Sequence, residues 1–319
     1  MKHKLLPVTV VAVLAIAPLF ARRFAARPAT VTIAVSALRI SQPLFVAIDQ
    51  GLFERHGVRA QVVPYNTAQP MLDDVALGRV DVGGFVAWPI VLNASTRSAR
   101  PLRVATTMVE DASHRVSYVL ARRGEGLRFP QDLPGKRVGI LPTIAYRRWL
   151  VAIARAASID PASFTIVNVE PSMQATMLAG RSIDLLFTND PMATAMLQRS
   201  IAEVVDDGPP CARRLSPSFS FGTVALSPSF VERSPALARG VVAALDEAIS
   251  ITHREPRTAQ RAMLPFLREV DRPFVAHYPA GSWQDSSRTA GALAAEIDAE
   301  RRMQILERTP NVLAFEAQP

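Results

Sequence analysis

The sequence predicts an α/β fold built from two similar α/β units. Short runs rich in Val and Ile alternate with segments that carry apolar residues at helical spacing, and this order implies parallel strands joined by helical crossovers. The same series starts afresh in the second half of the chain. One junction also occurs in both series, at residues 76–85 and 178–187: a helix ends in Gly-Arg, and an Asp precedes an apolar run.

The first unit is expected to contain three strands and two helices. Alternating Val and Ile predict its first strand. Leu44, Ile48 and Leu52, four residues apart, predict its first helical segment, which Gly51 and Gly57 divide into a helix, a turn and a short amphipathic extension. In the second helix Pro70 fits the first turn and Gly78 stands just past the end. In chain order the five elements are expected at residues 30–38, 44–58, 59–65, 67–78 and 80–85.

The second unit repeats this alternation after two further strand-like runs. Those runs lie at residues 103–109 and 115–123. The elements of the unit alternate between strand and helix, beginning with a strand, and are expected at residues 136–141, 145–158, 164–170, 172–180, 183–187 and 191–198.

A last strand at residues 221–227 and a long helix follow the second unit. Ser234 is placed to cap the helix, Pro235 fits its first turn, and the helix must stop before Pro256. Its apolar positions form one stripe: Leu237, Val241, Leu245 and Ile249.

The recurring junction predicts the same helix-to-strand turn in both units. Gly78 and Gly180 are expected to take the left-handed conformation that other side chains resist. An ordinary turn of this kind explains the two glycines, but it explains the recurring Asp81 and Asp184 less well.

Residue content argues against an enzyme, a metal site and a cofactor. Cys211 is the single cysteine, which excludes a disulfide or a cysteine metal cluster, and the five histidines are dispersed without metal-ligand spacing. The chain has no G-x-S-x-G elbow, phosphate loop or G-x-G-x-x-G fingerprint. Of the net charge of +8, the leader carries +5; the arginines behind the remaining +3 are scattered among acids, so we also expect no nucleic-acid partner.

The first residues indicate export. A basic start is followed by an uncharged apolar run over residues 5–21 and then by Arg22, Arg23 and Arg27. This pattern predicts that residues 1–27 are either a signal peptide or an N-terminal membrane anchor, and both outcomes stay open. Because no cysteine follows the run, a lipid anchor is excluded.

The ordered series of motifs resembles one family of binding proteins. "GLFERHGV" and "LGRVDVG" in the first unit, then "DLPGKRVGIL" and "MLAGRSIDLLFTNDPMATAML" in the second, are similar to the periplasmic solute-binding proteins of ABC importers. The match is to their nitrate/sulfonate/taurine group, also called NMT1-like. It covers roughly residues 30–270, and the tail after Asp271 matches poorly.

This resemblance implies a two-lobed periplasmic-binding-protein-like fold of type II. The ligand would bind in a cleft between lobes that are joined by two crossover strands, expected at residues 116–121 and 221–226. Lobe one would comprise residues 28–116 plus 222–319, including the C-terminal helices, and lobe two residues 117–221.

The resemblance also implies a function and partners. The chain would be the periplasmic, monomeric substrate-binding component of an ABC importer. It would capture a small organic, anionic solute of the sulfonate or carboxylate type by lobe closure and deliver it to the permease and ATPase subunits. Two alternatives remain: a cytoplasmic enzyme of the same fold, from pyrimidine, thiamine-precursor or menaquinone synthesis, and a membrane-tethered ligand sensor.

Candidate ligand contacts lie in the loops after the strands, because open α/β sheets bind ligands beyond the carboxyl ends of their strands. The candidates are Ser36, Arg39, Gln42, Phe85, Trp88, Thr107, Thr143, Tyr146, Asn189 and Asp190. Thr143 either contacts ligand or only caps its helix. Arg39, with Arg147, could hold an anionic group, whereas Asp190 would repel one.

The expected ligand is organic. Anion-binding members of the family commonly carry a Gly/Ser-rich loop where this chain has "PTIAY" at residues 142–146. Aromatic residues near the predicted cleft, including Tyr146 and Phe221, suit an organic sulfonate, a carboxylate or a heteroaromatic compound.

Overall fold

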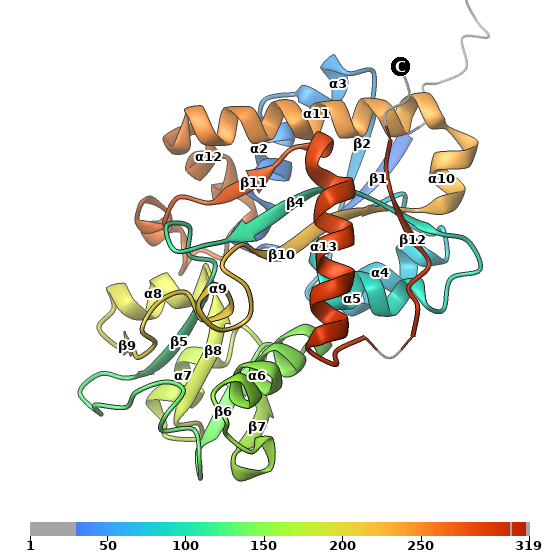
Figure 1. Cartoon of the computed structure of the whole chain (residues 1–319). Helices are drawn as coiled ribbons and strands as arrows, with labels where there is room; N and C mark the ends of the chain where they lie inside the picture. The colour runs from blue at the N-terminus through green and yellow to red at the C-terminus, as the bar shows by residue number, and fades with distance from the viewer. Residues whose placement is uncertain (1–29, 307, 317–319) are drawn as a thin grey trace, which may run out of the picture.

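The computed structural model describes residues 30–306 and 308–316, and it shows the predicted α/β fold as two sheets covered by helices (Figure 1). The signal peptide or anchor predicted at residues 1–27 lies outside the described residues. Within those residues, every helix is too short or too polar to cross a bilayer.

A seven-stranded sheet and its helices form what we call the larger lobe. Its strands are β1 (Thr30–Val35), β2 (Arg59–Pro64), β3 (Val82–Ala87), β4 (Leu102–Glu110), β10 (Phe219–Leu226), β11 (Ser282–Gln284) and β12 (Val312–Ala314). They are ordered β11, β4, β10, β3, β1 and β2, and β12 also pairs with β4. β1 runs parallel to β2 and β3, as the predicted crossovers require. β10 runs antiparallel to both of its neighbours.

The helices of the larger lobe place apolar faces against this sheet and against one another. They are α2 (Gln42–Asp49), α3 (Leu52–Arg55), α4 (Ala68–Ala76), α5 (Trp88–Ser95), α10 (Pro228–Arg233), α11 (Pro235–Arg254), α12 (Pro256–Met263) and α13 (Thr289–Arg302), with the 3-10 turns η2 (Arg39–Ser41), η4 (Leu264–Phe266), η5 (Arg272–His277) and η6 (Ser286–Arg288). The predicted stripe of α11 buries Val241, Leu245 and Ile249, and α11 packs on α2.

A five-stranded sheet forms the smaller lobe, at the lower left of Figure 1. It contains β5 (Ser117–Arg122), β6 (Arg137–Ile140), β7 (Thr165–Asn168), β8 (Leu185–Asn189) and β9 (Ala202–Val204), with α6 (Ile144–Ala156), α7 (Gln174–Ala179), α8 (Met192–Gln198), α9 (Pro210–Arg214) and η3 (Pro161–Ser163). The strand order is β7, β6, β8, β5 and β9. β6 runs parallel to β7 and β8, and β5 runs antiparallel to β8 and β9.

Glycine behaves as predicted at only one of the two recurring junctions. Gly78 has a φ of 73° and is left-handed. The prediction for Gly180 is wrong: its φ is −77°, and the next residue, Arg181, takes the left-handed turn with a φ of 60°. The division of residues 44–58 into a helix, a turn and a short extension is confirmed by α2 and α3, and Gly51 between them has a φ of 61°.

The recurring aspartates perform one structural task in both lobes. Asp81 accepts a hydrogen bond from the backbone N–H of Thr32 on β1, and Asp184 accepts one from that of Arg137 on β6, each at 2.9 Å. In both cases the carboxylate at the start of one strand binds the neighbouring parallel strand. The repeated sequence therefore marks equivalent strand-pairing contacts.

The chain passes between the sheets twice, once after β4 and once after β9. Residues 116–121 and 221–226, the expected crossover strands, lie mostly in β5 and β10, which follow those passages. β10 pairs with β4 from Phe219 onward, so residues 219–221, which the resemblance placed in lobe two, belong to the seven-stranded sheet.

Glu110, at the end of β4, connects both passages. One carboxylate oxygen accepts hydrogen bonds from the backbone N–H groups of Val116 and Ser117 and from the Ser117 hydroxyl. The other accepts from the backbone N–H groups of Cys211 and Ala212, at 2.9 and 3.0 Å. Burial raises the pKa of Glu110, and these hydrogen bonds oppose that rise. One buried carboxylate therefore binds the two segments about which the lobes would move.

The C-terminal tail, for which the sequence predicts no role, completes the larger sheet and reaches the smaller lobe. β11 pairs with β4 at Thr107–Val109, and β12 pairs with the same strand at Leu102–Val104, so the two short strands cover its edge end to end. α13 runs from the larger sheet towards α6 (Figure 1). Arg148 on α6 donates a hydrogen bond to the carbonyl of Ile305, just after α13.

Two buried glutamates on α13 predict a loss of stability at higher pH. The carboxylates of Glu296 and Glu300 are buried, and three of their four oxygens have no hydrogen-bond partner among the described residues. Burial raises the pKa of Glu300 to about 8, against the opposing effect of Arg148. Burial, followed by the charge of Glu300, raises the pKa of Glu296 as well.

Because these pKa values are raised in the folded state, folding retains protons that the unfolded chain releases near its ordinary glutamate pKa. Their stabilising contribution is complete below that pKa and is lost as the pH rises to about 8. Urea unfolding at pH 5 and pH 8 should show that Glu300→Gln loses less stability over this interval than the wild type. Equal losses would contradict the assignment, and the exposed Glu232→Gln serves as the matched control.

Candidate functional site

The carboxyl ends of the parallel strands in the two lobes face each other across a space that we call the central cavity. Its volume is about 60 Å³. The lining comes from the loops and strand ends that follow β1, β2 and β3 in the larger lobe and β6, β7 and β8 in the smaller one. The lining residues are Ser36, Leu38, Ile40, Asn66, Thr67, Ala68, Phe85, Val86, Ala87, Ile90, Leu141, Pro142, Thr143, Tyr146, Pro171, Asn189 and Phe221.

A second space of about 310 Å³, the outer chamber, adjoins the central cavity. Both spaces are lined by Ser36, Leu38, Asn66 and Pro171. The outer chamber differs in carrying charged side chains, namely Glu170, Arg268 and Asp271. The two adjoining spaces thus differ in character: the outer chamber carries ionic side chains, and the lining of the central cavity is largely apolar.

Two buried polar atoms on residues that line the central cavity make no hydrogen bond of standard geometry with the described residues. They are the hydroxyl of Tyr146 and the side-chain oxygen Oδ1 of Asn189, on residues that are 3% and 4% exposed. Burial raises the pKa of Tyr146 well above its ordinary value, against the opposing effect of the neighbouring Asn189 side chain, so the Tyr146 hydroxyl keeps its proton. A buried polar group without a partner costs about 1–3 kcal/mol. Both atoms are therefore suited to bind a ligand.

Aromatic packing fixes the Tyr146 ring at the boundary between the lobes. Its centroid lies 4.8 Å from that of Phe187 on β8 and 5.4 Å from that of Trp149 on α6. Phe221, on β10 of the larger lobe, lies 6.2 Å away at a steep angle. The cavity wall thus joins both lobes through side chains that the core holds in place.

Thr143 has the helix-capping role that the sequence allows. Its hydroxyl oxygen accepts a hydrogen bond from the backbone N–H of Tyr146 at 3.3 Å, and it also lines the central cavity. Ser36 and Phe85 line the cavity from the larger lobe. These residues, with Tyr146 and Asn189, are the predicted candidates that the structure brings together.

Arg39 and Asp190 do not line the central cavity but form a buried ion pair between the lobes. Nε of Arg39 lies 3.1 Å from Oδ2 of Asp190, and both side chains are almost fully buried. The guanidinium also donates to the carbonyl oxygens of Pro279 and Arg115. The other Asp190 oxygen accepts from the backbone N–H and the hydroxyl of Thr194. The Arg39 guanidinium, predicted to contact ligand, is thus bound to groups of the protein itself.

The remaining candidates also lie elsewhere. Trp88 is fully buried, and its indole N–H donates to the Thr107 hydroxyl, which donates in turn to the carbonyl of Gly222. Both residues belong to the core because their polar groups satisfy one another between strands. Gln42 lines a different hollow, beside His253, and Arg147 is exposed.

Several lining residues were missed by the sequence prediction. Asn66 and Thr67 follow β2, and Pro171 follows β7. The rule that ligands bind beyond the carboxyl ends of strands would have found them if it had been applied to every strand. The polar run at residues 65–67, between a strand and a helix, carries that signal.

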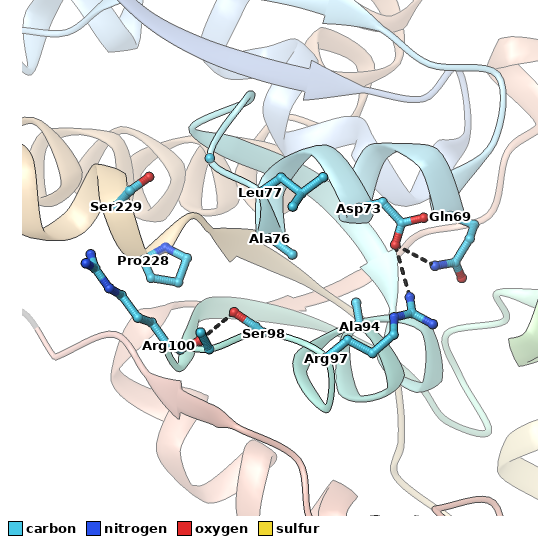
Figure 2. Close-up of a pocket in the computed structure, with 12 residues that line it drawn as sticks. Gln69, Asp73, Ala76, Leu77, Ala94, Arg97, Ser98, Arg100, Pro228 and Ser229 are labelled. Atoms are coloured by element: carbon cyan, nitrogen blue, oxygen red, sulfur yellow. Dashed lines mark hydrogen bonds and ion pairs between the residues drawn. The ribbon is translucent and has the colours of Figure 1, made fainter.

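A larger hollow, of about 940 Å³, lies in the larger lobe (Figure 2) and shares no lining residue with the central cavity. It is formed by the ends of α4 and α5 and the start of α10. Its polar side chains bind one another: Arg97 and Gln69 both contact Asp73, at 3.0 and 3.1 Å. None of the buried unpartnered side-chain atoms of the described residues lies in it. We therefore assign the functional site to the central cavity.

Metal chemistry has no evident support in the part of the chain that the structure describes. No group of three or more His, Cys, Asp or Glu side chains there could hold a metal ion. Tyr146 is also the only residue with an ionisable side chain among those that line the central cavity.

Comparisons with known proteins agree with this geometry. The family profile described as NMT1/THI5 like matches residues 41–259. No curated protein matches the chain by sequence.

Among solved structures, the alkanesulfonate-binding protein SsuA of Xanthomonas axonopodis pv. citri, bound to MOPS, has a TM-score of 0.70 and 17% identity, over 91% of this chain and 100% of its own. The periplasmic aliphatic sulphonate binding protein SsuA of Escherichia coli has a TM-score of 0.69 and 15% identity, over 92% and 96%. The periplasmic nitrate-binding protein NrtA of Synechocystis PCC 6803 has a TM-score of 0.58 and 13% identity, over 75% and 65%. At these identities the likeness establishes the fold.

Proposed function

Because the chain belongs to the NMT1/THI5-like family, we propose that it is the substrate-binding component of an ABC importer, which captures a small organic solute between its lobes. The observation that carries this proposal is the pair of unpartnered buried atoms, on Tyr146 and Asn189, in a cavity lined by both lobes. The sulfonate- and nitrate-binding proteins that share the fold support a role in solute binding.

The proposed mechanism is a shift between open and closed lobes. A solute in the central cavity contacts groups from both lobes, so it binds the closed form more tightly and increases its population. The motion takes place at the two passages between the sheets, where Glu110 binds both segments. The protein is exported to the periplasm, and its closed form is the one that the permease recognises before the ATPase subunits drive transport.

The composition of the cavity supports binding rather than catalysis. Its described lining contains no His, Cys, Lys, Arg, Asp or Glu side chain. A Ser, Thr or Tyr hydroxyl, such as those of Ser36, Thr143 and Tyr146, becomes a nucleophile when an adjacent base or charge activates it, and the lining supplies no such group. The enzyme alternative therefore receives no specific support from this site.

A thermal-shift screen of the purified full chain tests the proposal. The panel contains sulfonates, carboxylates, pyrimidines and small amides, and a true ligand raises the melting temperature because it binds only the native state. We expect at least one class to raise it in a concentration-dependent manner. A panel without any stabilising compound would contradict solute binding. A cytoplasmic product that keeps its N-terminal residues, as found by fractionation and N-terminal sequencing, would contradict export.

A further inference from the structure

The central cavity offers no charge to a ligand. None of its described lining residues is Lys, Arg, His, Asp or Glu. An ionised carboxylate or ammonium that enters such a site loses its hydration without gaining a counter-charged side chain, which costs several kcal/mol. The N-termini of α4 and α6, at Thr67 and Thr143, offer an anion only a partial positive charge. An uncharged polar group needs only hydrogen-bond partners, and the hydroxyl of Tyr146 and Oδ1 of Asn189 supply them.

A cation flanked along the chain by two residues of this cavity is held out of it. Arg39 lies between Leu38 and Ile40, which both line the cavity, yet Arg39 itself does not. Its guanidinium is bound by the Asp190 carboxylate of the opposite lobe and by two backbone carbonyls. Asp190 in turn follows directly after Asn189, which does line the cavity.

The outer chamber does not favour anions either. It is lined by two carboxylates, Glu170 and Asp271, and by one guanidinium, Arg268. Arg268 is paired with Asp271, with Nε 2.7 Å from Oδ2. The second carboxylate, Glu170, therefore leaves the lining of the outer chamber with one more negative than positive side chain.

We infer that the solute is uncharged where it enters the central cavity, and that Asp190 sets this selectivity by holding the Arg39 guanidinium away. The entering group carries an N–H or O–H that donates to Asn189 and an oxygen or nitrogen that accepts from Tyr146. A primary amide has both. This inference rests on the proposed function and deepens it, because it replaces the anionic ligand expected from the sequence with a neutral one.

Matched probes of one shape and different charge test the inference. Propionamide is compared with propionate and ethanesulfonate, and benzamide with benzoate and benzenesulfonate, by thermal shift and calorimetry on the full chain. We expect the amide of each set to bind at least about tenfold more tightly than its anions. An anion cannot donate to Asn189, and leaving one buried polar group without a partner lowers affinity by about that factor. Equal or tighter binding of the anions would overturn the inference and leave the proposed function standing. No binding by any probe would contradict both.

Variants separate the contribution of each group. Asn189→Leu removes the acceptor and should abolish the preference for the amide. Asp190→Asn leaves Arg39 without its counter-charge and should raise anion affinity about tenfold relative to the amide. The double variant Arg39→Gln with Asp190→Asn carries neither charge, so it should keep the amide preference even if the single variant folds poorly. Anion preference in the double variant, or an unchanged preference in a folded Asp190→Asn, would refute the role of Asp190.

Discussion

Replacing Glu110 with alanine should lower the free energy of unfolding by about 4 kcal/mol or more. The change removes the acceptor of five hydrogen bonds, four from backbone N–H groups and one from the Ser117 hydroxyl. Because Glu110 is fully buried, water cannot replace the carboxylate without opening the protein. Urea unfolding followed by circular dichroism measures the effect.

The matched control is Glu232→Ala, which removes an exposed carboxylate that pairs with Arg100. Exposed ion pairs contribute about 0–1 kcal/mol, so this variant should unfold almost as the wild type does. A loss of less than about 1 kcal/mol in Glu110→Ala would contradict the assignment of Glu110 as the group that binds both passages between the lobes.

Replacing Arg39 with methionine should destabilise the protein by about 3–5 kcal/mol, the cost of removing one partner from a buried ion pair. The variant leaves the Asp190 carboxylate buried without its counter-charge, although Thr194 and Tyr118 still donate to it. The pair also joins the two lobes, so small-angle scattering should show a larger radius of gyration for the variant.

The double variant Arg39→Met with Asp190→Asn should recover much of this loss, because no uncompensated charge remains. Arg100→Met, which breaks the exposed pair with Glu232, is the matched control and should change stability little. If Arg39→Met were as stable and as compact as the wild type, the ion pair would not hold the lobes together.

The order of strands and helices could be predicted because it depends on local patterns. Alternating Val and Ile mark β1, and apolar residues one turn apart mark α11, wherever the chain later packs. The tail could not be predicted in the same way. β11 and β12 are three residues each, too short for a periodic signal, and they are strands only because the edge of β4 supplies partners.

The sequence indicates which loops lie near the candidate site, but not which of their side chains point into it. The loops after the strands were placed correctly as neighbours, since the direction of parallel strands alone brings them together. The direction of each side chain depends on partners far along the sequence. Arg39 finds Asp190, 151 positions away, and Trp88 turns into the core towards Thr107. Neither partner leaves a local signal in the sequence.

Calorimetry on a variant with a filled cavity tests the central claim most directly. Ala87 lines the central cavity at the end of β3, and Ala87→Phe adds a ring that occupies much of its roughly 60 Å³. With the best ligand from the screen, the wild type should bind one molecule per chain, and the variant should lose that binding while its circular dichroism spectrum stays unchanged. Unaltered affinity in a folded Ala87→Phe would show that the solute binds elsewhere.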